Sequence, residues 1–416
     1  MRSRGRVWLA LVSAAGLVAI AVAYVGRDDP GTQRSAGVEP ASGEYPVPPP
    51  GRIGPGFAIA DGRVVVFGGR HSGAFDDFVA STSQLDLSTG SWEQLPEVPW
   101  PPSAHAIAAV GVGTSVVALA AACQSEPDRD TPADVDPIYE CPMRMVGARL
   151  DLTEHSWLNL ALPAGISDSG GTPDLLGSYG TDAFFAVGEP DHRLIWRYGG
   201  ASDEWERVRT PFRAWDSCVM GDMLAIVGAD YLRNGKVSEK TSLDGGLGEA
   251  MSASPGDGWT SPRIATLPLS SAPTRWSIGP GVPQVLYPDA PPELRCGANA
   301  VMVAPQLQPA DWEETKSFVF WPDRNVWSNE LEAMLPQGQI LSPMNGAVED
   351  QLILLSLVDA DPACVLFDLR TAKPVGFDCP SSVHGDVEAI ASLGSKVATL
   401  ISGPGDEADT VEIADV

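Results

Sequence analysis

Apolar runs of two different lengths divide this chain. The first run, residues 7–26, holds twenty residues without a charged side chain. A helix of that length crosses a bilayer at about 1.5 Å per residue. Every later apolar run has the length of a β-strand and is bounded by Gly, Pro, Asp or Ser. Such short runs between turn residues predict an all-β body behind a single membrane helix.

The residues that flank the long run predict its orientation. Three arginines (Arg2, Arg4 and Arg6) precede it and two aspartates (Asp28 and Asp29) follow closely. Positive charge favours the cytoplasmic side, so we expect a single-pass protein of the cell membrane with an extracytoplasmic body. A cleaved signal peptide ending at Ala21–Ala23 is the alternative. The predicted organisation is a cytoplasmic tail (1–6), a transmembrane anchor (7–26), a tether (27–43) and an extracytoplasmic domain (44–416).

The short runs repeat in groups of four. The clearest group spans residues 57–99, with turns at Asp61-Gly62 and at residues 88–90. Four antiparallel strands in about 45 residues match one blade of a β-propeller. Less regular groups follow, and the last is one strand short. We expect residues 44–50 to supply that strand and to close the ring, with seven blades as the prediction and six as the alternative.

The first group resembles a kelch repeat. It carries Val-Val-Val-Phe-Gly-Gly at 64–69, Leu-Asp-Leu-Ser-Thr-Gly-Ser-Trp at 85–92, and Leu95-Pro96. The resemblance implies that Trp92 fills the space between neighbouring blades. We expect the same role for the tryptophans that end similar turns, namely Trp157, Trp205, Trp259 and Trp327.

Some kelch-like propellers are enzymes, and the galactose oxidase type holds copper with two tyrosines and two histidines. The five histidines here (His71, His105, His155, His192 and His384) are scattered singly. Asp128, Asp130, Asp134 and Asp136 lack the glycine and the terminal glutamate of a regular calcium loop. We therefore predict no catalytic residue, no metal and no cofactor, and interpret residues 125–137 as an acidic surface loop.

Charge excludes one class of partner, and cysteine content predicts disulfides. The chain has 27 Lys and Arg against 54 Asp and Glu, a balance that repels nucleic acid. Six cysteines outside the membrane predict disulfides. The simplest of the fifteen connectivities pairs Cys123 with Cys141, Cys218 with Cys296, and Cys364 with Cys379.

The long loops predict a binding surface. In a four-stranded blade, the loop between the second and third strands lies on the same face as the loops between blades. The long loops at 70–82, 124–144 and 229–255 are mainly of these kinds. Loops held by a rigid scaffold commonly carry binding residues. We expect the exposed aromatic and basic residues of this face to bind a ligand: Arg70, His71, Phe75, Phe78, Trp100, Arg213, Trp215, Arg275 and Trp276. The alternative is that Trp100, Trp215 and Trp276 only cover the ends of blades.

These features together predict a non-catalytic module that binds an envelope or secreted protein, or a glycan. An extracellular carbohydrate-active enzyme is the main alternative, and it would need several ionisable side chains from different blades around one channel. A stalked scaffold whose anchor and tether matter most is a third interpretation.

Overall fold

The computed structural model describes the chain from Ser42 onward, with gaps. The described residues are 42–71, 74–124, 141–169, 171–188, 193–233, 236–237, 258–270, 275–283, 293–297, 299–304, 318–328, 339–348, 352–358, 364–368, 373–375, 386–393, 396–402 and 408–415. The anchor predicted at 7–26 lies outside them. Within these ranges, no helix combines the length and the apolar character that a membrane span requires.

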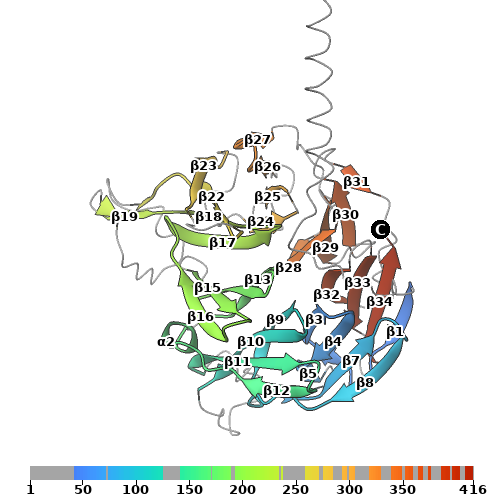
Figure 1. Ribbon diagram of the computed structural model, residues 1–416. Helices are drawn as coiled ribbons and strands as arrows, with labels where there is room; N and C mark the ends of the chain where they lie inside the picture. The colour runs from blue at the N-terminus through green and yellow to red at the C-terminus, as the bar shows by residue number, and fades with distance from the viewer. Residues whose placement is uncertain are drawn as a thin grey trace, which may run out of the picture. The chain divides into compact units, whose positions relative to one another are not determined.

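The described strands form seven four-stranded antiparallel sheets, named here sheets 1 to 7 in chain order (Figure 1). Sheet 1 contains β3 (Gly56–Ala60), β4 (Arg63–Phe67), β7 (Thr82–Asp86) and β8 (Ser91–Leu95). Sheet 2 contains β9 (His105–Val112), β10 (Ser115–Cys123), β11 (Met143–Asp151) and β12 (Ser156–Asn159). Sheet 3 contains β13 (Asp174–Tyr179), β14 (Asp182–Val187), β15 (Leu194–Gly199) and β16 (Glu204–Val208). A short helix, α2 (Ala164–Ser167), lies in the connection from sheet 2 to sheet 3.

The later sheets repeat this order. Sheet 4 contains β17 (Arg213–Met220), β18 (Met223–Ala229), β22 (Arg263–Pro268) and β23 (Ser277–Gly281). Sheet 5 contains β24 (Glu293–Cys296), β25 (Val301–Ala304), β26 (Phe318–Trp321) and β27 (Val326–Ser328). Sheet 6 contains β28 (Gln339–Val348), β29 (Leu352–Val358), β30 (Cys364–Asp368) and β31 (Lys373–Val375). Sheet 7 contains β32 (Asp386–Leu393), β33 (Lys396–Ser402), β34 (Thr410–Asp415) and the N-terminal strand β1 (Gly43–Pro46).

The sheets follow one another in a closed cycle. The first strand of each sheet contacts the first strand of the next, and β32 of sheet 7 contacts β3 of sheet 1. Strand β1 pairs with β34 from Gly43 opposite Ile413 to Pro46 opposite Thr410. This confirms the expectation that an N-terminal strand completes the last sheet. Repeated four-stranded sheets in such a cycle form a β-propeller.

Aspartates stabilise the turns that lead into the outer strands. In sheet 1 the carboxylate of Asp86 accepts hydrogen bonds from the backbone N–H of Ser88 (2.8 Å) and from its hydroxyl group. These bonds lower the pKa of Asp86 below its ordinary value. In sheet 2 Asp151 accepts bonds from the backbone N–H groups of Thr153 and Glu154 in the same way. The repeated Asp in this turn is therefore a structural residue.

Apolar clusters fill the space between neighbouring sheets. Ala58, Val65 and Phe67 of sheet 1 pack with Ala118 and Ala120 of sheet 2. Each of the five clusters among the described residues likewise combines side chains of two consecutive sheets. The core is thus divided into layers, and each layer depends on both sheets beside it.

A tryptophan closes the outer rim of these layers. Trp92, Trp157, Trp205 and Trp327 each occupy the second position of an outer strand and pack against a cluster shared with the preceding sheet. The ring of Trp157 lies 5.0 Å from that of Phe67, and its Nε1–H donates to Thr82 Oγ1 at 3.1 Å. For these four tryptophans the expected role between neighbouring sheets is confirmed.

The assignment of Trp259 to this role is wrong. Trp259 belongs to β21, which pairs with β19 outside sheet 4. The rim position in sheet 4 is taken by Trp276, just before β23, which packs against the cluster between sheets 3 and 4. Its Nε1–H donates to the backbone oxygen of Arg209 at 2.7 Å. The sequence misled because the segment at 257–259 imitates the turn that precedes the other tryptophans.

Candidate functional site

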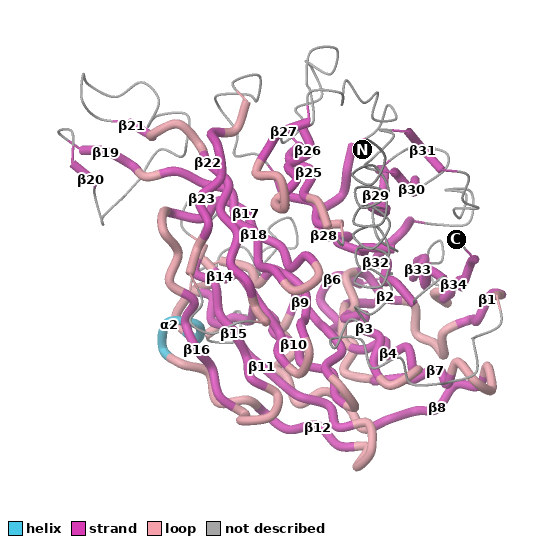
Figure 2. Tube along the Cα trace, turned by 45° about the horizontal axis from the view of Figure 1, so that its top comes forward, coloured by secondary structure: helices cyan, strands magenta, loops and turns pink. Residues whose placement is uncertain are grey.

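The extra strands and a disulfide-closed loop gather at one end of the sheets, named here the insertion end. This is the end of each sheet at which the second strand passes to the third and the chain enters from the preceding sheet. Strands β2 (Arg52–Ile53), β5 (Arg70–His71) and β6 (Ala74–Phe78) form a small sheet there. Strands β19 (Tyr231–Arg233), β20 (Lys236–Val237) and β21 (Gly258–Trp259) form another, between β18 and β22 (Figure 2).

Two glycines allow the chain to leave sheet 1 and enter the small sheet of β2, β5 and β6, named here the first insertion. Gly68 and Gly69 follow β4 with φ values of +63° and +87°, which residues other than glycine rarely adopt. A Cβ atom on Gly69 would lie 3.0 Å from the backbone oxygen of Ile53. The Gly-Gly pair of the kelch-like segment therefore lets the insertion pack against β2.

A buried arginine and a buried aspartate tie the first insertion to the C-terminal sheet. The backbone N–H of Arg52 donates to both carboxylate oxygens of Asp409, at 3.2 and 3.1 Å. The Arg52 guanidinium is 0% exposed, and its Nη2 donates to Ser81 Oγ at 2.8 Å. Burial lowers the pKa of Arg52 to about 10, although Asp409 raises it. Close by in the chain, the N–H of Gly54 donates to Glu388 of β32 at 3.0 Å.

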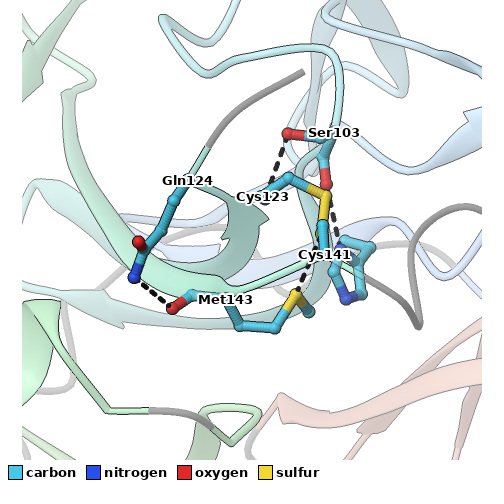
Figure 3. Close-up of a disulfide and its surroundings, with 6 residues drawn as sticks. Ser103, Cys123, Gln124, Cys141 and Met143 are labelled. Atoms are coloured by element: carbon cyan, nitrogen blue, oxygen red, sulfur yellow. Dashed lines mark hydrogen bonds between the residues drawn. A yellow bond between two sulfur atoms is a disulfide. The ribbon is translucent and has the colours of Figure 1, made fainter. Parts of the chain in front are cut away.

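A disulfide closes the connection between β10 and β11, named here the second insertion (Figure 3). Cys123, the last residue of β10, is bonded to Cys141, which precedes β11. Ser103 Oγ accepts the backbone N–H of Cys123 at 3.2 Å, and Met143 Sδ lies 3.6 Å from Cys141 Sγ. The side chain of Gln124 donates to the backbone oxygen of Met143 at 3.2 Å. The two ends of the acidic loop are therefore fixed, while residues 125–140 lie outside the described residues.

A second disulfide joins two neighbouring sheets. Cys218 of β17 is bonded to Cys296 of β24, and both lie in the apolar cluster between sheets 4 and 5. Nearby, Asp216 accepts the backbone N–H of Leu294 at 2.7 Å. Two of the three predicted disulfides are thus confirmed. The third involves Cys379, which lies outside the described residues.

Five of the predicted binding residues belong to the first insertion or to the connection beside it. Arg70 and His71 are half-buried in β5, and Phe78 packs against the cluster between sheets 1 and 2. Phe75 lies in β6, but its side chain is outside the description. Trp100 is only 8% exposed, and its ring lies 5.8 Å from that of Phe67. The expectation that Trp100 is exposed is therefore wrong, because it fills the core between two sheets.

The other four predicted residues belong to sheet 4, at both of its ends. Arg213 and Trp215 begin β17 at the insertion end, and Trp215 is buried with 8% of its surface exposed. Arg275 and Trp276 lie in the connection between β22 and β23. A connection from the third to the fourth strand lies at the opposite end of its sheet. The expectation that these two share a face with Arg213 is therefore wrong.

Sequence reasoning missed Arg52 and Asp409, which hold the insertion end together. Their positions differ by 357 residues, and neither belongs to a motif. Within the described part of the chain, no group of three or more His, Cys, Asp or Glu side chains is arranged to hold a metal ion. The aspartates considered as calcium ligands, at 128–136, lie outside that part.

Comparisons with known proteins find one motif and several similar solved structures. Residues 51–99 match the model of the Kelch motif. No curated protein matches the chain. Among solved structures, one described as the structure of YjhT is similar, with 11% identity and a TM-score of 0.41. The similarity covers 79% of this chain and 98% of that chain.

A second similar structure is the β-propeller domain of the Trilobed protease from Pyrococcus furiosus, whose title describes an open velcro topology. Identity is 8%, the TM-score is 0.49, and the similarity covers 88% of this chain and 95% of that chain. Both scores are too low to support an argument about function. The propeller fold therefore rests on the sheets themselves, and the similarity to the Kelch motif is limited to residues 51–99.

Proposed function

We propose that this chain is a membrane-anchored, extracytoplasmic kelch-type propeller of seven blades that binds an envelope or secreted protein, or a glycan, without catalysing a reaction. The insertion end is its binding surface. The observation that carries the proposal is that both small extra sheets and the disulfide-closed loop lie at this end. Loops that a rigid scaffold positions in this way are suited to recognition.

The way the insertions are held supports the proposal. The Arg52–Asp409 contact, the Glu388–Gly54 contact and the Cys123–Cys141 disulfide all lie at the insertion end. Restraints of this kind reduce the entropy lost when a loop binds a partner. The anchor proposed at 7–26 would keep this surface at the outer side of a membrane.

Photo-crosslinking in cells tests the surface. A photoreactive residue replaces Arg70 or Arg144 at the insertion end in the full-length protein, and replaces Ser88 at the opposite end of sheet 1 in the control. We expect discrete adducts from Arg70 and Arg144 and none from Ser88. A glycosidase that removes the added mass identifies a glycan. Adducts from Ser88 alone, or from no position, contradict the proposal.

Membrane extraction tests the anchor separately. We expect the full-length protein to stay in the membrane pellet at alkaline pH and to be digested by protease added to the outside of intact cells. A variant whose residues 7–26 are replaced by a cleavable secretory signal is expected in the soluble extracytoplasmic fraction. Protection of the full-length protein from external protease contradicts the proposed orientation.

A further inference from the structure

The outer strand of sheet 4 differs from the outer strands of sheets 1 to 3. Two residues after the rim tryptophan, those strands carry Gln94, Asn159 and Arg207, all polar and exposed. In β23 the corresponding residue is Ile278, which follows Trp276 and is 48% exposed. Leu158 of β12 and Val326 of β27 are also exposed, but they lie directly beside their tryptophans, whereas Ile278 takes a position that is polar in sheets 1 to 3.

Ile278 and Trp276 face the same neighbouring sheet. Ile278 pairs with Ala265 of β22, and Ala265 belongs to the cluster between sheets 3 and 4. Trp276, two residues earlier, packs against that cluster and donates to the backbone oxygen of Arg209 at the end of β16. Because alternate residues of a strand share a face, the two side chains form a continuous apolar strip at the rim between sheets 3 and 4.

Three exposed arginines belong to the segments that form or contact this strip. Arg275 precedes Trp276, Arg209 contacts it through its carbonyl group, and Arg263 lies on the same face of β22 as Ala265. None of the three forms an ion pair with another residue that the structure describes. Exposed arginines that form no ion pair among the described residues stand out in a chain of net charge −27. Arginine and tryptophan are also the residue types most enriched among those that dominate binding energy.

We propose that this rim patch, made of Arg209, Arg263, Arg275, Trp276 and Ile278, binds an acidic segment of a partner protein that carries one apolar anchor residue. The anchor packs on Ile278 beside the indole of Trp276, and flanking carboxylates pair with the arginines. Charge complementarity selects an acidic partner, because a basic one would be repelled by the three guanidinium groups. Arg209 and Arg263 lie toward the insertion end, but the anchor contacts at Trp276 and Ile278 lie just before and within the outer strand β23, so this inference goes beyond the role proposed for the insertions.

Selection from a library of random short peptides displayed on phage tests the proposal with the full-length protein in detergent. We expect the enriched peptides to carry several Asp or Glu residues around one aromatic or aliphatic residue. Ile278→Lys is expected to weaken their binding by at least about tenfold, the effect of losing an anchor contact. Arg275→Glu is expected to weaken it to a similar degree, and added salt should weaken it further.

Matched controls separate this patch from the rest of the surface. Leu158 is 49% exposed on the outer strand β12, and Arg324 lies in an exposed turn of sheet 5. Leu158→Lys and Arg324→Glu make the same changes elsewhere and should alter the dissociation constant by less than about twofold. Circular dichroism should show all four variants folded.

Four outcomes overturn the inference. One is that the enriched peptides are neutral or basic, and another is that they bind Ile278→Lys as tightly as the unchanged protein. Peptides whose binding is lost in Arg144→Glu instead would support the insertion end and contradict the rim patch. Concentration-dependent dimers in sedimentation that Ile278→Lys abolishes would show that a second copy occupies the patch.

Discussion

Tyr198 connects sheets 2 and 3 through its hydroxyl group. That group donates to Asp203 and accepts a hydrogen bond from Arg149 of β11 at 3.2 Å. Burial, followed by the bond to Asp203, raises the pKa of Tyr198 to about 12. We therefore expect one phenol to ionise near pH 12, later than an ordinary tyrosine, when phenolate absorbance is followed during an alkaline titration.

The same shift predicts how stability depends on pH. The folded state keeps the Tyr198 proton at a pH where the unfolded state has lost it, so the contribution is complete below about pH 10 and is lost as pH rises toward 12. Tyr198→Phe should remove both the late phase and this part of the decline, and Tyr179→Phe should keep both. A late phase that persists in Tyr198→Phe would refute the assignment.

The Arg52–Asp409 contact gives a second prediction at the residue scale. Asp409→Ala leaves the Arg52 backbone N–H and a fully buried guanidinium without their acidic partner. We expect the free energy of unfolding in urea to fall by about 1–3 kcal/mol, the range for hydrogen bonds to a charged group, because Asp409 accepts its bonds from the Arg52 backbone N–H. The double variant Arg52→Met with Asp409→Leu should be more stable than Asp409→Ala, because it removes the buried charge as well.

A matched surface change controls for the loss of an acidic residue. Glu97 is exposed in the connection between sheets 1 and 2, so Glu97→Ala should change stability by no more than about 0.5 kcal/mol. Equal effects of Asp409→Ala and Glu97→Ala would show that the buried contact contributes nothing to stability.

Strand β1 yields a prediction at the scale of an element. Its four residues pair with β34, and Lys396 Nζ donates to Ser42 Oγ at 2.9 Å just before it. A protein that begins at Val47 loses this strand and exposes the edge of β34. We expect it to unfold at lower urea concentration than a protein that begins at Ser42, and to self-associate in sedimentation experiments. Identical midpoints for the two would contradict the closing role of β1.

Elements with a regular pattern were predictable, and those with insertions were not. In sheet 1 the group predicted at 57–99 corresponds to β3, β4, β7 and β8, because each run fits one strand bounded by turn residues. In sheet 4 the insertion between β18 and β22 carries strands and a tryptophan of its own, so the sequence pattern points to Trp259 instead of Trp276. Local patterns cannot tell which of two similar turns belongs to the repeating sheet.

The candidate site was harder to predict than the sheets. Trp100 lies in the connection between β8 and β9, and Trp215 lies near the start of β17; at both positions exposure depends on the neighbouring sheet and not on local periodicity. Arg213 and Arg275 lie at opposite ends of sheet 4 because Arg275 precedes the fourth strand, β23. Sequence patterns alone do not identify β23 as that strand. The aspartates of the outer turns, by contrast, were visible in the sequence because their bonds are local.

At the scale of the whole molecule, the two disulfides among the described residues restrain different parts of the fold. Cys123–Cys141 closes a connection within sheet 2 at a separation of 18 residues, whereas Cys218–Cys296 joins sheets 4 and 5 at a separation of 78. Because a longer closed loop removes more entropy from the unfolded chain, we expect Cys218→Ala with Cys296→Ala to lower the free energy of unfolding by about 4–5 kcal/mol, against about 3 kcal/mol for Cys123→Ala with Cys141→Ala. Urea unfolding without reductant measures both. A larger loss from the Cys123–Cys141 pair would mean that the acidic connection, and not the junction of sheets 4 and 5, limits the stability of the propeller.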